Sequence, residues 1–443
     1  MNEKKKWEKR IEKVEIKKLG INGEGVGYIS KKICFIDHAL PGELVEVEIY
    51  EENRKYMRGK VLKILKASSQ RVPTFCHESQ HCLGCSLTCM KYQQQLPFKQ
   101  EILKDALRKY TDFDVSQLPI KDVVEASPHK NYKHVASLPM TYFQGKVKAG
   151  IYQRQSKYLV LMDHCSLHDP LVNQCIQQIE DILHKYHVRD YNDKIKKGLR
   201  FMKIRNIDQQ IQVVFVTGKN GLKPEVTKEI SQIKAVKSIF YTVNTANYQD
   251  FELQGYKKIY GESRIPFQCF HQNYLYSIKS DFPINPIMEE QKLKIIQSFI
   301  SPGQSILSIH CGVGLLELAI DNPVTAIDEK KCHIEDAKDN AKFLRKNHAR
   351  FICHPIDKEV VYQCKNHQYD MAIVHKEPFT DKMKESFILS KIKDIIYVSE
   401  YPSEIAKNIM DLKAYYDIDD MIPIDMQPYS AKITTIIHLK RKF

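Results

Sequence analysis

The chain has 443 residues, of which 43% are hydrophobic and 28% are charged, and this balance is typical of a folded globular protein. Its length allows two or three domains. No apolar run reaches the ~20 residues of a membrane span, and MNEKKKWEKR at the start lacks the apolar core of a signal peptide. The sequence therefore excludes a helical membrane protein and predicts a cytoplasmic one, with its twelve cysteines reduced.

Positive charge is in excess, because 68 Lys and Arg stand against 54 Asp and Glu, a net charge of +14. Residues 1–66 alone carry 16 basic and 11 acidic side chains. Such an excess favours a polyanionic partner, since neutralising phosphates releases counterions. A lysine-rich surface without a partner is the alternative.

Residues 11–66 read as about five short strands separated by glycine-rich turns. Val45, Val47 and Ile49 alternate with more polar positions, which is the period of a half-buried strand. This pattern predicts an OB-like barrel, a frequent platform for nucleic acids, although an SH3-like barrel would give a similar pattern.

A cysteine cluster follows the barrel. Cys76, Cys82 and Cys85 form a C-x5-C-x2-C motif, and Cys165 stands alone in the segment MDHCSLHDP. In a reducing compartment such spacing indicates metal ligands rather than disulfides. Four thiolates suit a tetrahedral zinc ion or an iron–sulfur cluster. A structural zinc site could also be completed by His77, His81 or Cys89.

The middle of the chain mixes strands and helices. Amphipathic patterns predict helices over residues 91–110 and 171–187. The expected strands cover residues 140–153, 157–163, 211–218 and 238–244. This region therefore reads as an α+β domain.

From residue 283 strands and helices alternate, which predicts a doubly wound, mostly parallel sheet with ligands at the carboxyl ends of its strands. Gly312-Val313-Gly314 opens the first helix, where the backbone can approach a ligand closely. Asp328 ends the next strand and is placed to bind a ribose.

Taken together, these segments resemble the RNA uridine-C5 methyltransferase family over nearly the whole chain. The similar segments are GEGVGYI with FIDHALPGELVEVEI, the cysteine motif with HCSLHDPLVN, PFQCFHQN, and IHCGVGLLELA. The resemblance implies a TRAM domain of OB fold in residues 1–67 and a central domain in residues 74–265. It implies a class I S-adenosylmethionine (SAM) methyltransferase-like domain in residues 266–443. It also shifts the metal expectation to a [4Fe-4S] cluster.

The same resemblance implies the ligand sets. The cluster ligands would be Cys76, Cys82, Cys85 and Cys165. The residues around the methyl donor would be Gln268, His310, Gly312, Gly314 and Asp328. Leu315 and Pro355 stand where the family has polar or acidic residues, so the donor carboxylate and adenine would each lose a partner. Retained and lost donor binding both stay open.

The family reaction uses a cysteine thiolate that adds to uracil C6 and a carboxylate that removes the C5 proton. Here the nucleophile position is Glu400, in YVSEYP, and the base position is Thr434, in YSAKITTI. The acidic loop of the family aligns with residues 375–378, which read HKEP. Substitute nucleophiles would have to come from Cys269, Cys311, Cys332, Cys353 or Cys364.

We therefore expect a monomeric, cytoplasmic protein that binds structured ribosomal or transfer RNA, with no DNA or membrane partner and with lost or altered catalysis. One alternative is an active uridine-C5 methyltransferase of ribosomal or transfer RNA that uses another nucleophile. The other is an RNA-binding sensor gated by an iron–sulfur cluster.

Overall fold

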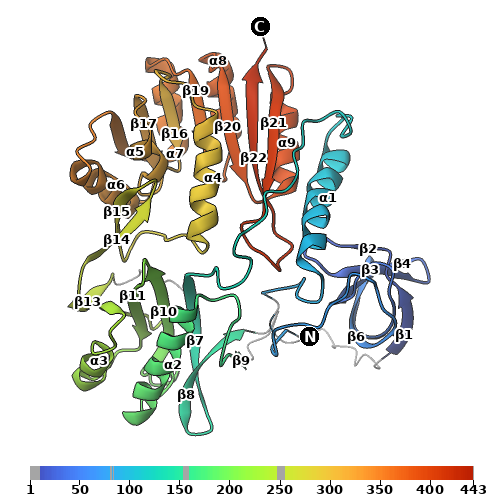
Figure 1. Ribbon diagram of the computed structural model, residues 1–443, viewed down its shortest axis with the longest axis vertical. Helices are drawn as coiled ribbons and strands as arrows, with labels where there is room; N and C mark the ends of the chain where they lie inside the picture. The colour runs from blue at the N-terminus through green and yellow to red at the C-terminus, as the bar shows by residue number, and fades with distance from the viewer. Residues whose placement is uncertain (1–9, 80–81, 83, 153–158, 247–254, 443) are drawn as a thin grey trace.

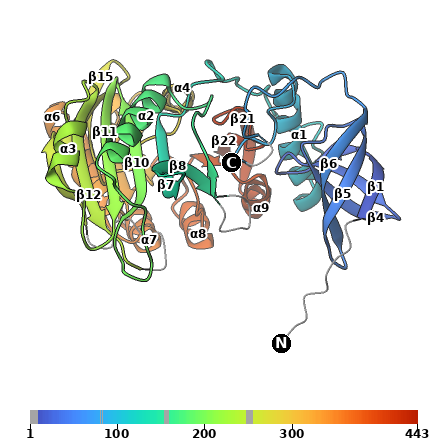
Figure 2. The same ribbon diagram turned by 90° about the horizontal axis from the view of Figure 1, so that it is seen from below.

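The computed structural model describes residues 10–442 apart from 80–81, 83, 153–158 and 247–254. Three sheets form an N-terminal barrel, a central layer and a C-terminal layer covered by helices (Figure 1). Seen from below, the barrel and the central sheet lie on opposite sides of helix α1, Tyr92–Tyr110 (Figure 2). Among the helices of these residues, none is long and apolar enough to cross a membrane.

The barrel contains six strands rather than the expected five, because Lys18–Leu19 forms a short additional pair. Val45, Val47 and Ile49 are buried as their alternation predicted. A Cβ at Gly59 would lie 2.2 Å from Val47, so this glycine lets β5 and β6 approach closely. In spatial order the strands are β1 (Arg10–Glu15), β5 (Leu44–Glu52), β6 (Tyr56–Lys66), β4 (Lys32–Asp37), β3 (Gly25–Ile29) and β2 (Lys18–Leu19).

Helix α1 joins the barrel to the C-terminal layer. It buries Leu103 and Leu107 as its sequence pattern predicted, but Lys99 on the same face is also fully buried. Lys99 Nζ lies 2.5 Å from Asp425 Oδ1 and donates to the Gln427 carbonyl at 3.1 Å. A buried ion pair, in addition to apolar packing, therefore holds this helix against the segment that contains Asp425 and Gln427.

The central sheet has seven strands, all antiparallel to their neighbours except the parallel pair β11–β12. Arg205, 1% exposed, donates to the carbonyls of Ser277 and Ser280, so a buried cation ties this sheet to the C-terminal layer. In spatial order the strands are β13 (Lys257–Gly261), β12 (Val236–Val243), β11 (Gln210–Thr217), β10 (Leu199–Ile207), β7 (Val135–Phe143), β8 (Lys146–Tyr152) and β9 (Leu159–Leu161). The same region of the chain also contains helices α2 (Pro170–Lys185) and α3 (Pro224–Ile230).

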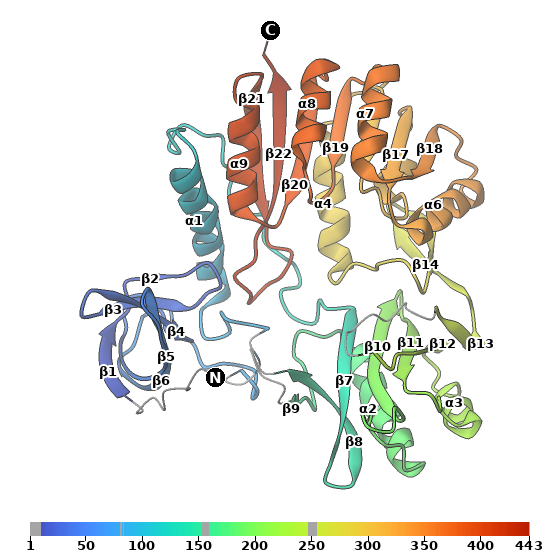
Figure 3. The same ribbon diagram turned by 180° about the vertical axis from the view of Figure 1, so that it is seen from behind.

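The C-terminal layer confirms the expected doubly wound sheet. Five parallel strands are extended by an antiparallel pair, in the order β18-β17-β16-β19-β20-β22-β21. Helix α4 covers one face and α7, α8 and α9 the other (Figures 1 and 3). The strands are β16 (Ile306–Ile309), β17 (Val324–Asp328), β18 (Ala349–Cys353), β19 (Met371–Val374), β20 (Asp394–Ser399), β21 (Tyr416–Ile424) and β22 (Thr434–Arg441), preceded by the hairpin β14 (Arg264–Cys269) and β15 (Gln272–Ser277). The helices are α4 (Pro286–Ser298), α5 (Leu315–Ala319), α6 (Lys331–Phe343), α7 (Ile356–Asn366), α8 (Asp381–Leu389) and α9 (Pro402–Leu412).

Candidate functional site

A glycine turn follows β16 at the carboxyl edge of the sheet. Gly312 and Gly314 have φ angles of 58° and 82°, the left-handed region that glycine adopts without strain. A Cβ at Gly314 would lie 2.9 Å from the ring of Phe351, so packing also requires glycine there. The Gly312 amide donates to Asp328 Oδ2 at 3.2 Å. The structure thus brings together the turn and the acid that the sequence assigned to the methyl donor.

Asp328 is held in a buried network. Its Oδ2 lies 3.1 Å from His333 Nδ1, and its Oδ1 accepts from the Lys330 amide at 2.8 Å. The other ring nitrogen of His333 lies 3.4 Å from Asp281. Burial alone would raise the pKa of Asp328 and lower that of His333, but their hydrogen bond and opposite charges reverse both directions. His333, which the sequence reasoning missed, is therefore more readily protonated than a free histidine, beside the expected ribose acid.

A pocket of about 220 Å3 opens beside this network. His310 lies on its wall, is 7% exposed, and has a buried Nε2 without a hydrogen-bond partner. Burial, together with the charge of Lys376, lowers the pKa of His310 to about 4. Its imidazole is therefore neutral near pH 7 and can make one further hydrogen bond to a ligand. Gln268 is exposed on β14 and does not line this pocket.

The pocket also contains a carboxylate that the motif comparison did not indicate. Glu317, at the start of α5, is 1% exposed and lies 3.0 Å from His375 Nε2. The hydroxyl of Ser308 donates to the same carboxylate oxygen at 2.5 Å. A buried Glu–His contact thus involves His375, the first residue of the segment that aligns with the acidic loop of the family. Only the three-dimensional neighbourhood of α5 and β19 reveals it.

The two replaced reaction positions meet at the same edge of the sheet. Ser399 pairs with Thr435 across β20 and β22, so Glu400 and Thr434 follow at adjoining ends of neighbouring strands. The Glu400 side chain is 42% exposed, and its carboxylate lies 3.9 Å from Lys432 Nζ. Thr434 is only 5% exposed. A carboxylate and a buried hydroxyl therefore occupy this edge.

A second carboxylate, Glu377, lies near Glu400. Burial raises the pKa of Glu377 to about 7, and the charges of Glu400 and Glu404 act in the same direction. The Tyr397 hydroxyl donates to Glu377 at 3.3 Å. Glu377 thus exchanges a proton near neutral pH, a property that its position after β19 did not predict.

The loop between β21 and β22, residues 425–433, leads into Thr434 and is fixed by the cysteine-rich segment. The Leu87 amide donates to the Tyr429 carbonyl at 3.0 Å, and the Tyr429 amide donates to Gln95 Oε1 at 3.0 Å. The Tyr132 hydroxyl donates to the Pro428 carbonyl at 3.0 Å. The region around the cysteine motif therefore positions the end of the sheet that carries Glu400 and Thr434. We call this end the acceptor edge.

Cys76, Cys82, Cys85 and Cys165 come from two separate loops and lie near one another. Burial, together with the charges of the other three thiols, raises the pKa of Cys85 to about 12. The donor set fits an iron–sulfur cluster in type and number. In the described ranges, however, no three His, Cys, Asp or Glu side chains have the spacing that holds a metal ion. His81 lies outside the described residues.

The possible substitute nucleophiles are poorly suited to attack. Cys311 lines the donor pocket, but burial raises its pKa well above the usual range. Burial also raises the pKa of Cys269 to about 12 and that of Cys364 to about 11. Cys353 is exposed and Cys332 half-buried, and both lie on the donor side of the sheet, at β18 and α6.

Comparison with known proteins supports this arrangement. Residues 6–62 match the TRAM domain model. An uncharacterized RNA methyltransferase of Bacillus cereus is 30% identical over 446 residues, covering 97% of this chain and 96% of that one. An uncharacterized RNA methyltransferase of Streptococcus pyogenes is 26% identical and covers 97% and 98% of the two chains. The crystal structure of Pyrococcus abyssi tRNA (uracil-54, C5)-methyltransferase with S-adenosyl-L-homocysteine matches 97% of this chain and 100% of that one, with a TM-score of 0.78 and 21% identity.

These findings define a TRAM-containing protein with a methyltransferase-like C-terminal domain. The chain belongs to the RNA methyltransferase family of its bacterial relatives, and its fold matches that of the Pyrococcus abyssi tRNA (uracil-54, C5)-methyltransferase.

Proposed function

We propose that the protein is an RNA-binding member of this family that does not form 5-methyluridine by cysteine addition. The observation that supports the proposal most strongly is the pair of side chains at the acceptor edge, Glu400 and Thr434. A carboxylate is a poor nucleophile toward uracil C6, and a threonine hydroxyl is too weakly basic near pH 7 to remove the C5 proton. Neighbouring Glu377 offers a proton acceptor but no nucleophile.

The donor end retains more of its machinery. The Pyrococcus abyssi enzyme was crystallised with S-adenosyl-L-homocysteine, and we propose that the pocket around Gly312 and Asp328 binds the same class of ligand. A ribose hydroxyl would have to share Asp328 with His333, which weakens binding relative to a free carboxylate. The neutral imidazole of His310 offers one additional hydrogen bond.

Structured RNA is the proposed partner, in the cytoplasm. Its support is the net charge of +14 and the TRAM match at the basic N-terminus. Purified protein should bind transfer or ribosomal RNA in filter assays, with affinity falling steeply between low and physiological salt. Absence of binding at low salt would refute the RNA partner.

We further propose that Cys76, Cys82, Cys85 and Cys165 bind a [4Fe-4S] cluster. Support comes from the number and type of the four thiols and from the resemblance of their motif to the cluster ligands of the family. When bound, such a cluster would cross-link the two loops that support Tyr132 and Tyr429. Anaerobically prepared protein should contain about four irons and as many acid-labile sulfides per chain. Stoichiometric zinc without iron would instead identify a structural zinc site.

Nucleoside mass spectrometry tests the catalytic part of the proposal. RNA from cells with and without the gene should contain equal amounts of 5-methyluridine. RNA containing 5-fluorouridine should form no covalent complex with the native protein, whereas a cysteine-dependent enzyme would be trapped. A donor-dependent covalent band would refute the proposal.

A further inference from the structure

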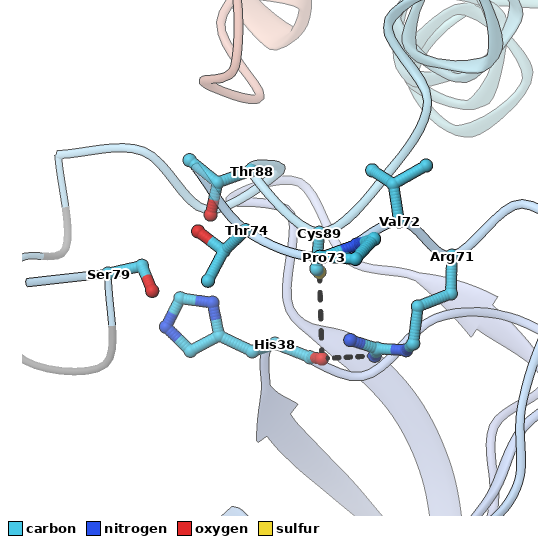
Figure 4. Close-up of a pocket in the computed structure, with 8 residues that line it drawn as sticks. All are labelled: His38, Arg71, Val72, Pro73, Thr74, Ser79, Thr88 and Cys89. Atoms are coloured by element: carbon cyan, nitrogen blue, oxygen red, sulfur yellow. Dashed lines mark hydrogen bonds between the residues drawn. The ribbon is translucent and has the colours of Figure 1, made fainter. Parts of the chain in front are cut away.

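A second pocket lies outside the donor site, where the barrel meets two further segments. These are the linker, residues 68–73, and the cysteine-rich segment, which carries Cys76, Cys82 and Cys85. It has a volume of about 360 Å3. Figure 4 shows its walls: the His38 ring comes from the barrel, Val72 and Pro73 from the linker, and Thr88 from the cysteine-rich segment. The volume is at the lower end of the range of ligand pockets, ~300–1,000 Å3, and suits one heterocycle with its sugar rather than several nucleotides.

Two polar groups of this pocket are buried without hydrogen-bond partners. Thr88 is 1% exposed, and its Oγ1 has no partner in the described residues. His38 Nε2 is also buried and has no partner in the part of the chain that the structure describes. A buried polar group without a hydrogen-bond partner destabilises the folded protein. Two such groups in one pocket indicate that a ligand or ordered water completes their hydrogen bonds.

The charged residues of the pocket argue against an anionic ligand. Arg71 is the cation on its wall, but the guanidinium is paired with Glu43, which is fully buried, and also donates to the His38 carbonyl at 2.7 Å. Burial lowers the pKa of His38, so its ring is neutral near pH 7. A phosphate would find no uncompensated positive charge there.

The remaining features match an uncharged heterocycle. Val72, Pro73 and the imidazole ring provide flat, largely apolar contact, while Thr88 Oγ1 and His38 Nε2 provide donors and acceptors for a polar edge. Unpaired RNA bases are recognised in this way, by stacking together with hydrogen bonds to their edges.

The surroundings connect this pocket to the acceptor edge of the sheet. A neighbouring groove of about 630 Å3 shares His38 and is lined by Lys133 and Lys432. Lys432 is the residue that lies 3.9 Å from Glu400. Glu24 and Asp37 also line this groove, so its two lysines offer individual contacts to an RNA backbone rather than a net positive surface.

We propose that the pocket between His38 and Thr88 binds one unpaired base of the RNA, separate from any base at the methyltransferase edge. The proposal rests on the proposed RNA-binding function. The base stacks against the wall formed by Pro73 and the imidazole, and its edge pairs with Thr88 Oγ1 and His38 Nε2. This contact would select a single-stranded or bulged nucleotide at a fixed distance from the acceptor edge.

Binding of 12-nucleotide single-stranded RNAs to the full-length protein at low salt tests the proposal. The probes are oligo(A), oligo(U), oligo(C) and an abasic strand with the same phosphates. Thr88→Val keeps the shape of the side chain but removes its hydroxyl. It should weaken binding of at least one base-containing strand about fivefold, the effect of one hydrogen bond, and leave the abasic strand unaffected. His38→Gln serves as a second variant if Thr88→Val fails to fold.

Thr217→Val is the matched control. Thr217 is fully buried in β11, its hydroxyl is also unpaired, and it does not line this pocket; its replacement should not change binding of any strand. Equal effects of Thr88→Val on all four strands, or none on any, would overturn the base pocket while leaving RNA binding intact. Binding of free nucleosides without base-dependent binding of the strands would also overturn it, because the site would then serve a small molecule. If no strand binds at low salt, the RNA-binding function itself fails.

Discussion

The donor and acceptor ends of the C-terminal sheet differ in which features of the family they retain. At the donor end, Gly314 is constrained by the Phe351 ring, and the Gly312 amide is bonded to Asp328. At the acceptor end, Glu400 is partly exposed and Thr434 begins a strand. If the proposed assignment of the reaction positions holds, the residues that the fold needs are those that match the family, and the residues with a purely chemical role are those that differ from it. A preserved methyltransferase fold is therefore no measure of preserved methyl transfer.

The strongest challenge to this comparison is to restore the acceptor end. Glu400→Cys with Thr434→Glu should produce 5-methyluridine in RNA supplied with SAM, whereas the native protein and each single variant should not. The thiolate can add to C6 and the carboxylate can remove the C5 proton, and neither step completes the reaction alone. The expected gain in rate is several orders of magnitude, measured by nucleoside mass spectrometry.

Glu400→Ser with Thr434→Glu is the matched control, because it changes the same positions without providing a thiolate. It should remain inactive. Formation of 5-methyluridine by the control or the native protein would mean that the acceptor end still works through other groups. The comparison between the two ends would then be wrong.

The second prediction concerns the support of the acceptor end. Lys99→Met should lower the free energy of unfolding by about 3–5 kcal/mol, because it leaves Asp425 buried without its partner. Lys432→Met, which breaks the exposed contact with Glu400, should change it by less than about 1 kcal/mol. Chemical denaturation of both variants measures the two effects. Similar losses in both would show that the buried pair does not anchor the β21–β22 loop.

Sequence patterns predicted much of the fold because the hydrophobic period is a local property. The strand–helix alternation after residue 283 could be predicted in this way. So could the glycine turn at Gly312 and the position of Asp328 at the end of the next strand. Strand β10 was missed because Leu199–Ile207 is buried almost throughout, including Arg205 and Asn206. Its polar side chains conceal the pattern of a strand.

The site was harder to predict because its electrostatics depend on contacts between distant segments. Lys99 looks like a surface residue of an amphipathic helix, yet its partner lies 326 positions away. His333 follows Asp328 closely, but its charge also depends on Asp281 from another segment. The pKa of Glu377 depends on burial, which no local pattern reveals. Motif positions could thus be predicted, whereas their charges and partners could not.

The third prediction is a pH dependence at the acceptor end. The pKa of Glu377 rises from an ordinary 4.5 to about 7 in the folded protein. Its contribution to stability is therefore fully present below about pH 4.5 and is lost as the pH rises through 7. Because Glu377 is only partly buried and solvent screens its charge, Glu377→Gln should be more stable than the native protein by about 2 kcal/mol at pH 8 and equally stable at pH 4.5.

Thermal or chemical denaturation at the two pH values measures the effect. Glu404→Gln is the control, since this nearby side chain is 46% exposed and its replacement should change stability by less than about 0.5 kcal/mol. An equal effect of Glu377→Gln at pH 4.5 and pH 8 would mean that lost packing, not titration, is responsible.

The smallest expected effect lies at the donor end. There a substitution removes stability at low pH, whereas Glu377→Gln adds stability at high pH. The folded-state pKa of His333 is raised by Asp281 and Asp328 against the effect of burial, so its stabilisation is present below its unfolded pKa of about 6.5 and is lost as the pH rises through the folded value. His333→Gln should therefore cost about 1 kcal/mol at pH 6, and this cost should shrink as the pH rises through the folded pKa of the native imidazole. Glu377→Gln gains stability at high pH, whereas His333→Gln loses it at low pH, so denaturation of both variants across pH 4.5–9 separates the two ends. A His333→Gln effect that persists at pH 9 would show that the imidazole acts through packing and that Asp328 does not depend on its charge.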